Sequence, residues 1–291
     1  MSEAPIQIKL TSLPSLPLAY LRALFARKGT PTRPTPVIVA ALSGLRFDAA
    51  RLGRYCTELE IPTSEHLPIL YPQVVTAAAF AELILIPAFP FRPLGLVHRR
   101  TTVAAMQPLP VAAAYEASFR IQVAHDTEQG TEVDFSTELT REGALAWRGT
   151  ATVLVRAQGA AAKRRATQPP PPALDGPGTR VVAWPVSSDV GRRYARVSGD
   201  YNPIHLSAWS ARLFGYRRAI AHGMWTLARA FSELEHSVTE PMTVEASFKR
   251  PLFLPASVLC WVRAEPQGVH FGVRDAETGV PHLVAQTRGS T

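Results

Sequence analysis

Cysteine is scarce in this sequence of 291 residues, which contains only Cys56 and Cys260. The two thiols lie in apolar or strand-like stretches, without the short spacing that zinc ligands have. We therefore expect two reduced cysteines in the core of a cytoplasmic protein, with no disulfide and no metal. Residues 1–12 also lack a basic segment followed by an apolar run, so no secretion signal is expected.

Long hydrophobic runs are missing as well. The most apolar stretch, residues 74–86, is too short to span a membrane, contains Glu82 and is followed by Pro87, so it predicts a buried helix. The sequence also lacks a Gly-rich phosphate loop and a Gly-x-Ser-x-Gly motif. These absences argue against nucleotide hydrolysis and against a serine hydrolase, and we expect no cofactor.

The chain is basic, with 31 Lys and Arg against 23 Asp and Glu and a net charge of +8. Such a charge permits nucleic acid, anionic lipid or a phosphorylated ligand as a partner. Because no nucleic-acid motif is present and most basic residues are scattered, we expect neither nucleic acid nor membrane. A phosphorylated ligand is the partner class that stays compatible with this charge. The pairs Lys249-Arg250 and Arg217-Arg218 are candidate phosphate contacts, although a solvated surface explains each pair equally well.

The length suggests about two domains, and the pattern of the first half agrees. Residues 1–35 form a Pro-rich arm with one helical stretch, residues 19–27, which we expect to be loosely structured. The elements predicted after it are a strand at 36–45, helices at 49–57 and 74–86, and strands at 119–124, 132–139 and 145–155. The consecutive strands predict an antiparallel meander with one face on a core.

Residues 159–178 break this pattern with a basic triplet and a run of four prolines, and we interpret them as a linker. The second half then repeats the first. Its predicted elements are strands at 179–186, 242–252, 258–263, 269–275 and 283–287, a short helix at 188–197 and a long helix at 223–235. The predicted domains are therefore 36–158 and 179–291.

The stretch Ser198-Gly-Asp-Tyr-Asn-Pro-Ile-His205 contains the residues best suited to chemistry. Pro203 fixes its own φ and pushes Asn202 out of the α region, so Asp200 and His205 flank a tight turn instead of sharing one helix. A helix is expected to follow at 206–213. Taken alone, this run is also good turn chemistry in any loop.

His222-Gly223 strengthens the functional interpretation. Gly223 opens the predicted long helix, where its N–H has no intrahelical acceptor and suits a carbonyl oxygen that gains negative charge. An acid, an imidazole and such a donor are the groups needed to add or remove water beside a thioester carbonyl.

Residues 199–224 resemble the hydratase motif of the MaoC-like, (R)-specific enoyl-CoA hydratase family. The positions that carry the resemblance are Asp200, Asn202, Pro203, His205, His222 and Gly223. The resemblance covers about the last 110 residues, and the first half resembles the degenerate copy of two-domain members. It implies an α+β double hot-dog, with two antiparallel sheets that each wrap around a long central helix. The two hot-dogs would pair within one chain, and further homodimer formation is left open.

The resemblance also implies reversible hydration of trans-2-enoyl thioesters to (R)-3-hydroxyacyl thioesters. Gly223 would bind the thioester oxygen through its N–H, and Asp200 and His205 would hold one water. Which of the two acts as the base is left open, because their pKa values depend on burial and on each other. In addition, Asn202 and Ser198 would support the pair, and His222 would be mainly structural.

A comparison of the two halves predicts one active site per chain. Ala79–Leu83 matches Ala230–Leu234, and Arg54-Tyr55 matches Arg193-Tyr194, which leaves the first half twelve residues short between these points. The missing segment corresponds to the Asn-Pro-x-His turn. The match also sets Tyr71 opposite His222 and Pro72 opposite Gly223. Because proline has no N–H, the first copy should be catalytically empty.

Two alternatives remain at this stage. A thioesterase of hot-dog fold would hydrolyse similar substrates with a carboxylate and without the Asn-Pro-x-His set. A non-catalytic acyl-binding subunit of a larger complex would need neither Asp200 nor His205 for binding. The sequence does not determine the acyl chain length, nor whether the acyl group is carried on CoA or on a carrier protein.

Overall fold

The computed structural model describes residues 4–25, 35–93, 95–156, 178–234 and 241–289. Its strands are β1 (Ile6–Lys9), β2 (Ile38–Leu45), β3 (Leu96–Ala105), β4 (Tyr115–Thr127), β5 (Gly130–Arg141), β6 (Ala144–Arg156), β7 (Thr179–Val186), β8 (Met242–Phe248), β9 (Ala256–Glu265), β10 (Gly268–Asp275) and β11 (Pro281–Gly289). The helices are α1 (Leu16–Phe25), α2 (Ala49–Glu58), α3 (Tyr71–Leu83), α4 (Val190–Ser198), α5 (Ala208–Arg212) and α6 (Gly223–Phe231), with a 3₁₀ turn η2 (Pro203–His205).

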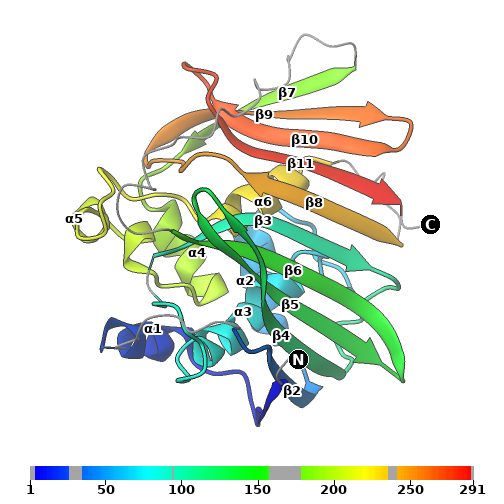
Figure 1. Cartoon of the computed structure of the whole chain (residues 1–291). Coiled ribbons are helices and arrows are strands. Elements are labelled where there is room, and N and C mark those ends of the chain that lie inside the picture. Colours follow the sequence, from blue (N-terminus) through cyan, green and yellow to red (C-terminus); the bar gives the residue numbers. More distant parts are fainter. Residues whose placement is uncertain (1–3, 26–34, 94, 157–177, 235–240, 290–291) are drawn as a thin grey trace.

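All these strands join in one sheet with the order β1-β2-β4-β5-β6-β3-β8-β11-β10-β9-β7 (Figure 1). Within it, β2-β4-β5-β6-β3 and β7-β9-β10-β11-β8 are two sets of five strands with the same connectivity, which confirms the predicted repeat. Antiparallel pairing of β3 with β8 joins the sets, with Val103 opposite Val244. The two halves therefore form one continuous sheet.

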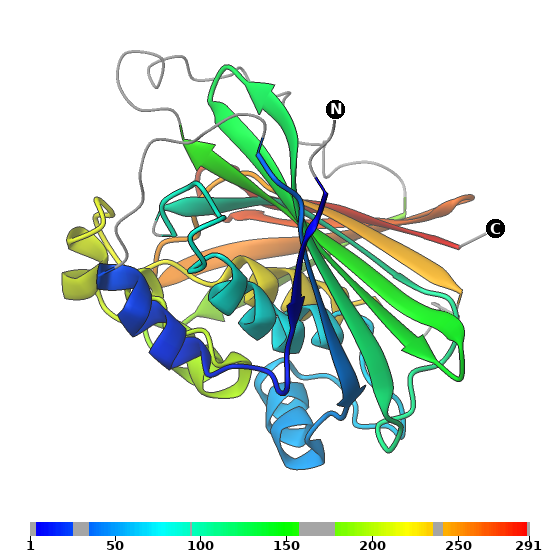
Figure 2. The same cartoon turned by 60° about the horizontal axis from the view of Figure 1, so that its bottom comes forward.

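The helices gather on one side of this sheet (Figures 1 and 2). In the first half, α3 packs on β4 and β5 through Phe80, whose ring lies 5.7 Å from Phe119 and 5.2 Å from Phe135. In the second half, α6 packs on β10, with the rings of Phe231 and Phe271 6.1 Å apart. Each five-strand set thus wraps around its own helix, which confirms the α+β double hot-dog.

The helix pair α2 and α4 connects the two halves on the same side. The Tyr55 and Tyr194 rings are fully buried and 6.3 Å apart, and Arg193 Nε is 3.0 Å from Glu58 Oε2. Residues 59–70, twelve in number, connect α2 to α3, whereas the twenty-four residues 199–222 connect α4 to α6. The difference of twelve residues confirms the predicted insertion in the second half.

Several local predictions differ from the structure. Strand β3 was not predicted, because its sequence LVHRRTTVAA does not alternate; the Arg100 side chain is instead neutralised by the buried Glu132, 2.5 Å away. In the arm, Ile6–Lys9 pairs in parallel with β2 and α1 follows, so these residues are more ordered than expected. The helix predicted at 206–213 is divided, because the Ser207 side chain caps a separate α5.

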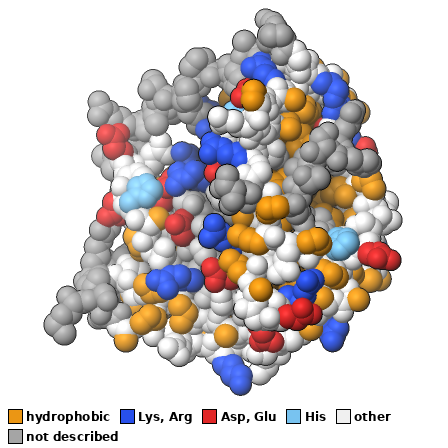
Figure 3. All heavy atoms as spheres, turned by 90° about the vertical axis from the view of Figure 1, so that its right-hand side faces the viewer, with side chains coloured by type: hydrophobic (Ala, Val, Ile, Leu, Met, Phe, Trp, Pro, Cys, Tyr) orange, Lys and Arg blue, Asp and Glu red, His pale blue; other side chains and the backbone are white. Residues whose placement is uncertain are grey.

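The helix predicted at 223–235 ends at Phe231 and continues only as a turn. The linker predicted at 159–178 lies outside the described residues apart from its last position. None of the helices within the described ranges is long and apolar enough to cross a membrane. On the face shown in Figure 3, basic, acidic and apolar side chains are interspersed.

Candidate active site

The end of α4 forms the tight turn that the sequence predicts. Gly199 has φ +80°, a left-handed conformation that ends the helix. The Ser198 hydroxyl donates to the Tyr194 carbonyl at 2.8 Å and accepts from the Asp200 N–H at 3.1 Å. The Asp200 carboxylate then accepts from the Asn202 N–H at 3.1 Å. Ser198 and Asp200 thus set the backbone path of the turn through their own hydrogen bonds.

His205 lies at the far end of this turn, in η2, and is buried. The Asn202 side chain caps η2 by accepting from the Ile204 N–H at 3.4 Å. The Nδ1 of His205 is 2.8 Å from the Ile220 carbonyl oxygen, which can only accept, so Nδ1 carries the proton. The Nε2 of the neutral ring therefore has a lone pair with which to accept a proton.

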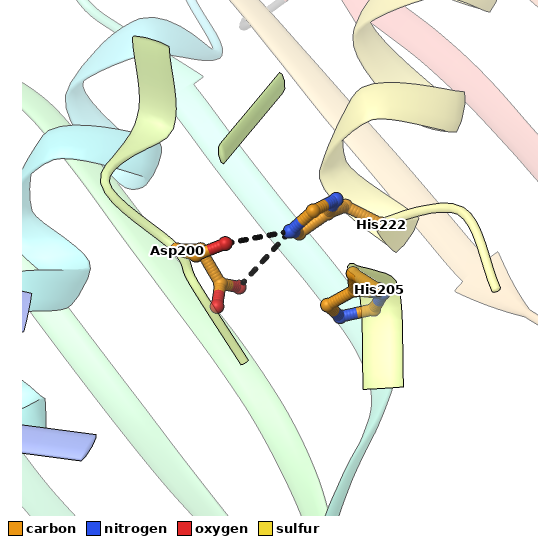
Figure 4. Close-up of side chains that lie close together, drawn as sticks. All are labelled: Asp200, His205 and His222. Carbon is orange, nitrogen blue, oxygen red and sulfur yellow. Dashed lines mark hydrogen bonds and ion pairs between the residues drawn. The ribbon is translucent and has the colours of Figure 1, made fainter. Parts of the chain in front are cut away.

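His222 connects the start of α6 to the turn (Figure 4). Its Nε2 donates to the Asp200 carbonyl oxygen at 2.9 Å and lies 3.9 Å from the Asp200 Oδ2. Its ring stacks on His205, with centroids 3.7 Å apart and planes inclined by 25°. His222 therefore contacts both Asp200 and His205 from the N-terminus of α6.

Asp200, His205 and His222 each offer one ligand-type atom, and these atoms lie within 4.8 Å of one another. The sequence spacing did not predict such a set. However, His205 Nδ1 and His222 Nε2 already donate to carbonyl oxygens, and two nearly parallel stacked rings direct their remaining lone pairs along parallel planes. This arrangement does not converge on one ion and fits acid–base chemistry better.

Burial decides the charge of the site. Burial, followed by the neighbouring His222, lowers the pKa of His205 to about 3, although Asp200 and the Ile220 carbonyl favour protonation. Burial also lowers the pKa of His222, against the same influence of Asp200. Both imidazoles are therefore neutral at pH 7, and His205 starts without a proton on Nε2.

Gly223 is the first residue of α6, so its N–H has no acceptor within the helix. The ring of Phe248, from β8, covers this position so closely that a Cβ on Gly223 would lie 3.0 to 3.4 Å from three ring atoms. A side chain here would push Phe248 away. Glycine therefore allows this close packing of Phe248 and leaves the N–H accessible to a substrate oxygen.

The first half contributes His98, which sequence analysis did not identify. Its ring lies 4.6 Å from the Phe248 ring, and its Nε2 donates to the Arg100 carbonyl at 3.0 Å. Burial lowers the pKa of His98 to about 4, while Asp200 is close enough to oppose this shift. His98 and Phe248 thus place β3 and β8 beside the start of α6. No sequence signal pointed to His98, because it comes from the unpredicted strand β3.

Arg51 is a second contribution from the first half. From α2, its Nε donates to the Val197 carbonyl at 2.7 Å and its Nη2 to the Ser198 carbonyl. These carbonyls belong to the last turn of α4, where a cation also stabilises the helix dipole. Arg51 therefore fixes the residues directly before Asp200, and only the packing of α2 on α4 shows it.

We expect Arg51→Ala to lower kcat about tenfold, because hydrogen bonds from a charged group contribute about 1.5 to 3 kcal/mol to the turn they hold. Arg51→Lys keeps the charge and should recover part of the rate. Arg54→Ala, an exposed arginine of the same helix, is the matched control. Steady-state kinetics of the three variants would show no difference between Arg51 and Arg54 if Arg51 had no positioning role.

The first copy has different residues at the corresponding place. The Tyr71 and Tyr55 rings lie 4.8 Å apart, as the His222 and Tyr194 rings do at 5.0 Å, so Tyr71 occupies the place of His222. Pro72 stands in the first turn of α3 where α6 has Gly223. These positions support the inference that the first copy has no catalytic site.

The structure places the two predicted basic pairs, Lys249-Arg250 and Arg217-Arg218, in different surroundings. Lys249 follows Phe248 directly, and burial together with Arg99 and Arg100 lowers its pKa, so it lies among cations beside the start of α6. Arg250 is half-buried, and its carbonyl faces His282 Nδ1 at 3.2 Å. Arg217 and Arg218 lie over the Phe253 ring at 4.6 and 5.9 Å. Of these four residues, Lys249 is the one that directly follows Phe248, whose ring covers Gly223.

The neutral histidines predict how stability depends on pH. Below about pH 6.5 the unfolded chain protonates its histidines, whereas His98 and His205, with pKa values lowered to about 4 and about 3, stay neutral in the folded protein. The pKa of His222 is lowered as well, so the free energy of unfolding should fall as the pH drops from 7 to 4.5. Denaturant unfolding at several pH values measures this slope. His205→Gln should reduce it, and an unchanged slope in that variant would contradict the prediction.

The chain is similar to several known proteins. Residues 172–284 match the family model described as a MaoC like domain. The chain is 29% identical over 248 residues to 3-hydroxyacyl-thioester dehydratase X of Mycobacterium tuberculosis, covering 84% of this chain and 87% of that protein. It is 25% identical over 177 residues to the peroxisomal enoyl-CoA hydratase 2 of Arabidopsis thaliana, covering 56% and 57% of the two chains. The crystal structure of HtdX from Mycobacterium tuberculosis superposes with a TM-score of 0.74 at 27% identity, covering 87% of this chain and all of that one.

Proposed function

We propose that this chain, in which residues 172–284 match a MaoC like domain, is a hydro-lyase that interconverts trans-2-enoyl thioesters and (R)-3-hydroxyacyl thioesters. The observation that carries this proposal is that Asp200, His205 and His222 each have a ligand-type atom within 4.8 Å of the others, and that His222 directly precedes Gly223, the first residue of α6. A carboxylate and a neutral imidazole can hold a water, and the helix N-terminus beside them can bind the thioester oxygen.

The protonation state of His205 determines how the proton moves during hydration. The thioester oxygen accepts from the Gly223 N–H, so that negative charge developing on this oxygen is stabilised as water adds to C3. Because neutral His205 has no proton on Nε2, the proton that reaches C2 is one that the water gave up. Asp200 and His205 take this proton when the C3–O bond forms and return it to C2. Dehydration reverses these steps.

The other predicted residues support this reaction. Ser198 and Asn202 shape the turn between the two catalytic groups, and His222 ties Asp200 and His205 to α6. Lys249, with Arg99 and Arg100 near it, is proposed to contact a phosphate of CoA or of a phosphopantetheine arm. For Arg250, Arg217 and Arg218 the same contact is a weaker proposal, because Arg217 and Arg218 are engaged with Phe253.

We also propose that residues 36–158 act as a non-catalytic hot-dog that supports the catalytic one at 179–291. Arg51 and His98 are its contributions. A cytoplasmic location is proposed on the two cysteines, which are free and buried and so suit a reducing compartment.

The loss of the conjugated enoyl absorbance with crotonyl-CoA and a longer enoyl-CoA tests the proposed reaction, together with chiral analysis of the product. We expect the (R)-3-hydroxyacyl thioester. Release of free thiol without loss of the enoyl group would instead show a thioesterase. If neither reaction occurs while acyl thioesters still bind, the protein is an acyl-binding subunit.

A further inference from the structure

An unusual density of arginine surrounds the catalytic turn. Residues 190–232 contain seven arginines but only one acidic residue, Asp200. Arg193 and Arg229 are neutralised, because Arg193 pairs with Glu58 and Asp189, and Arg229 pairs with Glu60 and Glu233. The remaining five form no ion pair with the described part of the chain; they are Arg192, Arg196, Arg212, Arg217 and Arg218.

Two apolar side chains project from the same region. Trp209 is 72% and Leu213 68% exposed, which makes them the most exposed large hydrophobic residues that the structure describes. They stand four positions apart at α5, so they lie on one helix face, with Arg212 beside them. Arg192 reaches this segment by donating to the Leu206 carbonyl at 2.9 Å, and Arg217 comes five residues after the end of α5. We call Trp209, Leu213, Arg192, Arg212 and Arg217 the α5 patch.

The α5 patch is attached to the catalytic turn. The Ser210 hydroxyl, next to Trp209, donates to the Pro203 carbonyl at 2.7 Å and so fastens α5 onto η2, which ends at His205. Tyr201, between Asp200 and Asn202, is itself 38% exposed. In Figure 1, α5 protrudes from the end of the molecule where the turn lies. A partner bound to the patch would be adjacent to the site.

We propose that the α5 patch is the docking surface for an acidic acyl carrier protein that presents its acyl-phosphopantetheine arm to Asp200 and His205. This inference rests on the proposed function. Unpaired arginines around an exposed tryptophan and leucine have the composition of a protein interface centre, and they complement a negative partner.

Other anionic partners fit the patch less well. A nucleotide such as that of CoA is usually held in a concave pocket, whereas Trp209 and Leu213 protrude. Membrane-surface helices bury a long apolar face, whereas α5 has five residues and exposes two large apolar side chains at its end. A small acidic protein uses both features of the patch, its charge and its projecting apolar residues.

The test uses the full chain and an acidic type II acyl carrier protein, both in its holo form and loaded with a crotonyl group. The variants are Trp209→Ser combined with Leu213→Ser, and separately Arg212→Glu. We expect each to raise the KM for the crotonyl carrier protein at least about tenfold, with kcat/KM for crotonyl-CoA within about twofold of the intact protein. Matched controls are Val181→Ser, an exposed apolar residue of β7, and Arg148→Glu, an exposed arginine of β6.

Titration with the holo carrier protein, which has no acyl group, tests docking apart from catalysis. Binding by the intact protein and its loss in both variants supports the surface even if every thioester proves inert, in which case only the proposed reaction fails. Docking is overturned if the intact protein does not bind the holo carrier protein, or if the variants bind it normally. An equal rise in KM for crotonyl-CoA, or variant-sensitive binding only to phosphatidylglycerol vesicles, also overturns it and identifies a nucleotide or lipid contact instead.

Discussion

Replacing Asp200 by asparagine is expected to lower kcat for hydration of enoyl thioesters by about 10²- to 10⁴-fold, the usual contribution of a general acid or base. The amide keeps the shape of the side chain and an oxygen that can still accept from the Asn202 N–H. It has no negative charge to take a proton from water. His205→Gln should cause a loss of similar size, because the amide cannot replace the Nε2 lone pair as a base.

The combined variant should be little slower than either single one, since the two residues handle one water and act as a unit. Asp189→Asn is the matched control: this carboxylate lies at the other end of α4 and is half-exposed, outside the site. Stopped-flow or steady-state measurements of the enoyl absorbance give kcat for each variant. If Asp200→Asn kept more than about a tenth of the rate, Asp200 would not be a catalytic group.

A single methyl group at Gly191 is expected to be almost as damaging. Gly191 lies in the first turn of α4, and a Cβ there would approach the His205 carbonyl oxygen well inside the 3.0 Å below which something must shift. Because the obstacle is backbone and not a flexible side chain, either α4 or the catalytic turn must move. Gly191→Ala should therefore cost about 1 to 3 kcal/mol of stability. It should also reduce kcat about 10²-fold, the cost of a misplacement of about 1 Å.

Gly53 provides the matched control, because it lies in the corresponding helix α2 and a Cβ there would meet nothing within 4 Å. Gly53→Ala should raise stability by about 0.5 to 1 kcal/mol and leave kcat unchanged. Thermal unfolding and steady-state kinetics of both variants measure the contrast. Equal behaviour of the two alanine variants would show that α4 does not press against the catalytic turn.

The sequence alone predicted the local backbone geometry of the site. Pro203 and Gly199 impose the turn between Asp200 and His205 by backbone sterics alone, and the structure has that turn. Similarly, alternating residues along β4 and β5 predicted the meander, and the matched segments predicted the repeat with its insertion of twelve residues. Each of these features depends on residues that are close in the chain, which is why the pattern of the sequence was sufficient.

Tertiary structure alone decided what surrounds this local site. Strand β3 has no clear pattern because its backbone is paired on both sides, by β6 and β8, and its Arg100 is neutralised by Glu132 of β5. The positions of Arg51 and His98 beside the turn depend on two halves packing together across more than a hundred residues of chain. The neutrality of His205 also comes from burial under His222 and not from its own segment. The sequence by itself therefore determined which groups can do chemistry. The packing of the two halves decided the protonation of these groups and the contacts that hold them in place, because burial and contact between distant segments leave no local pattern in the sequence.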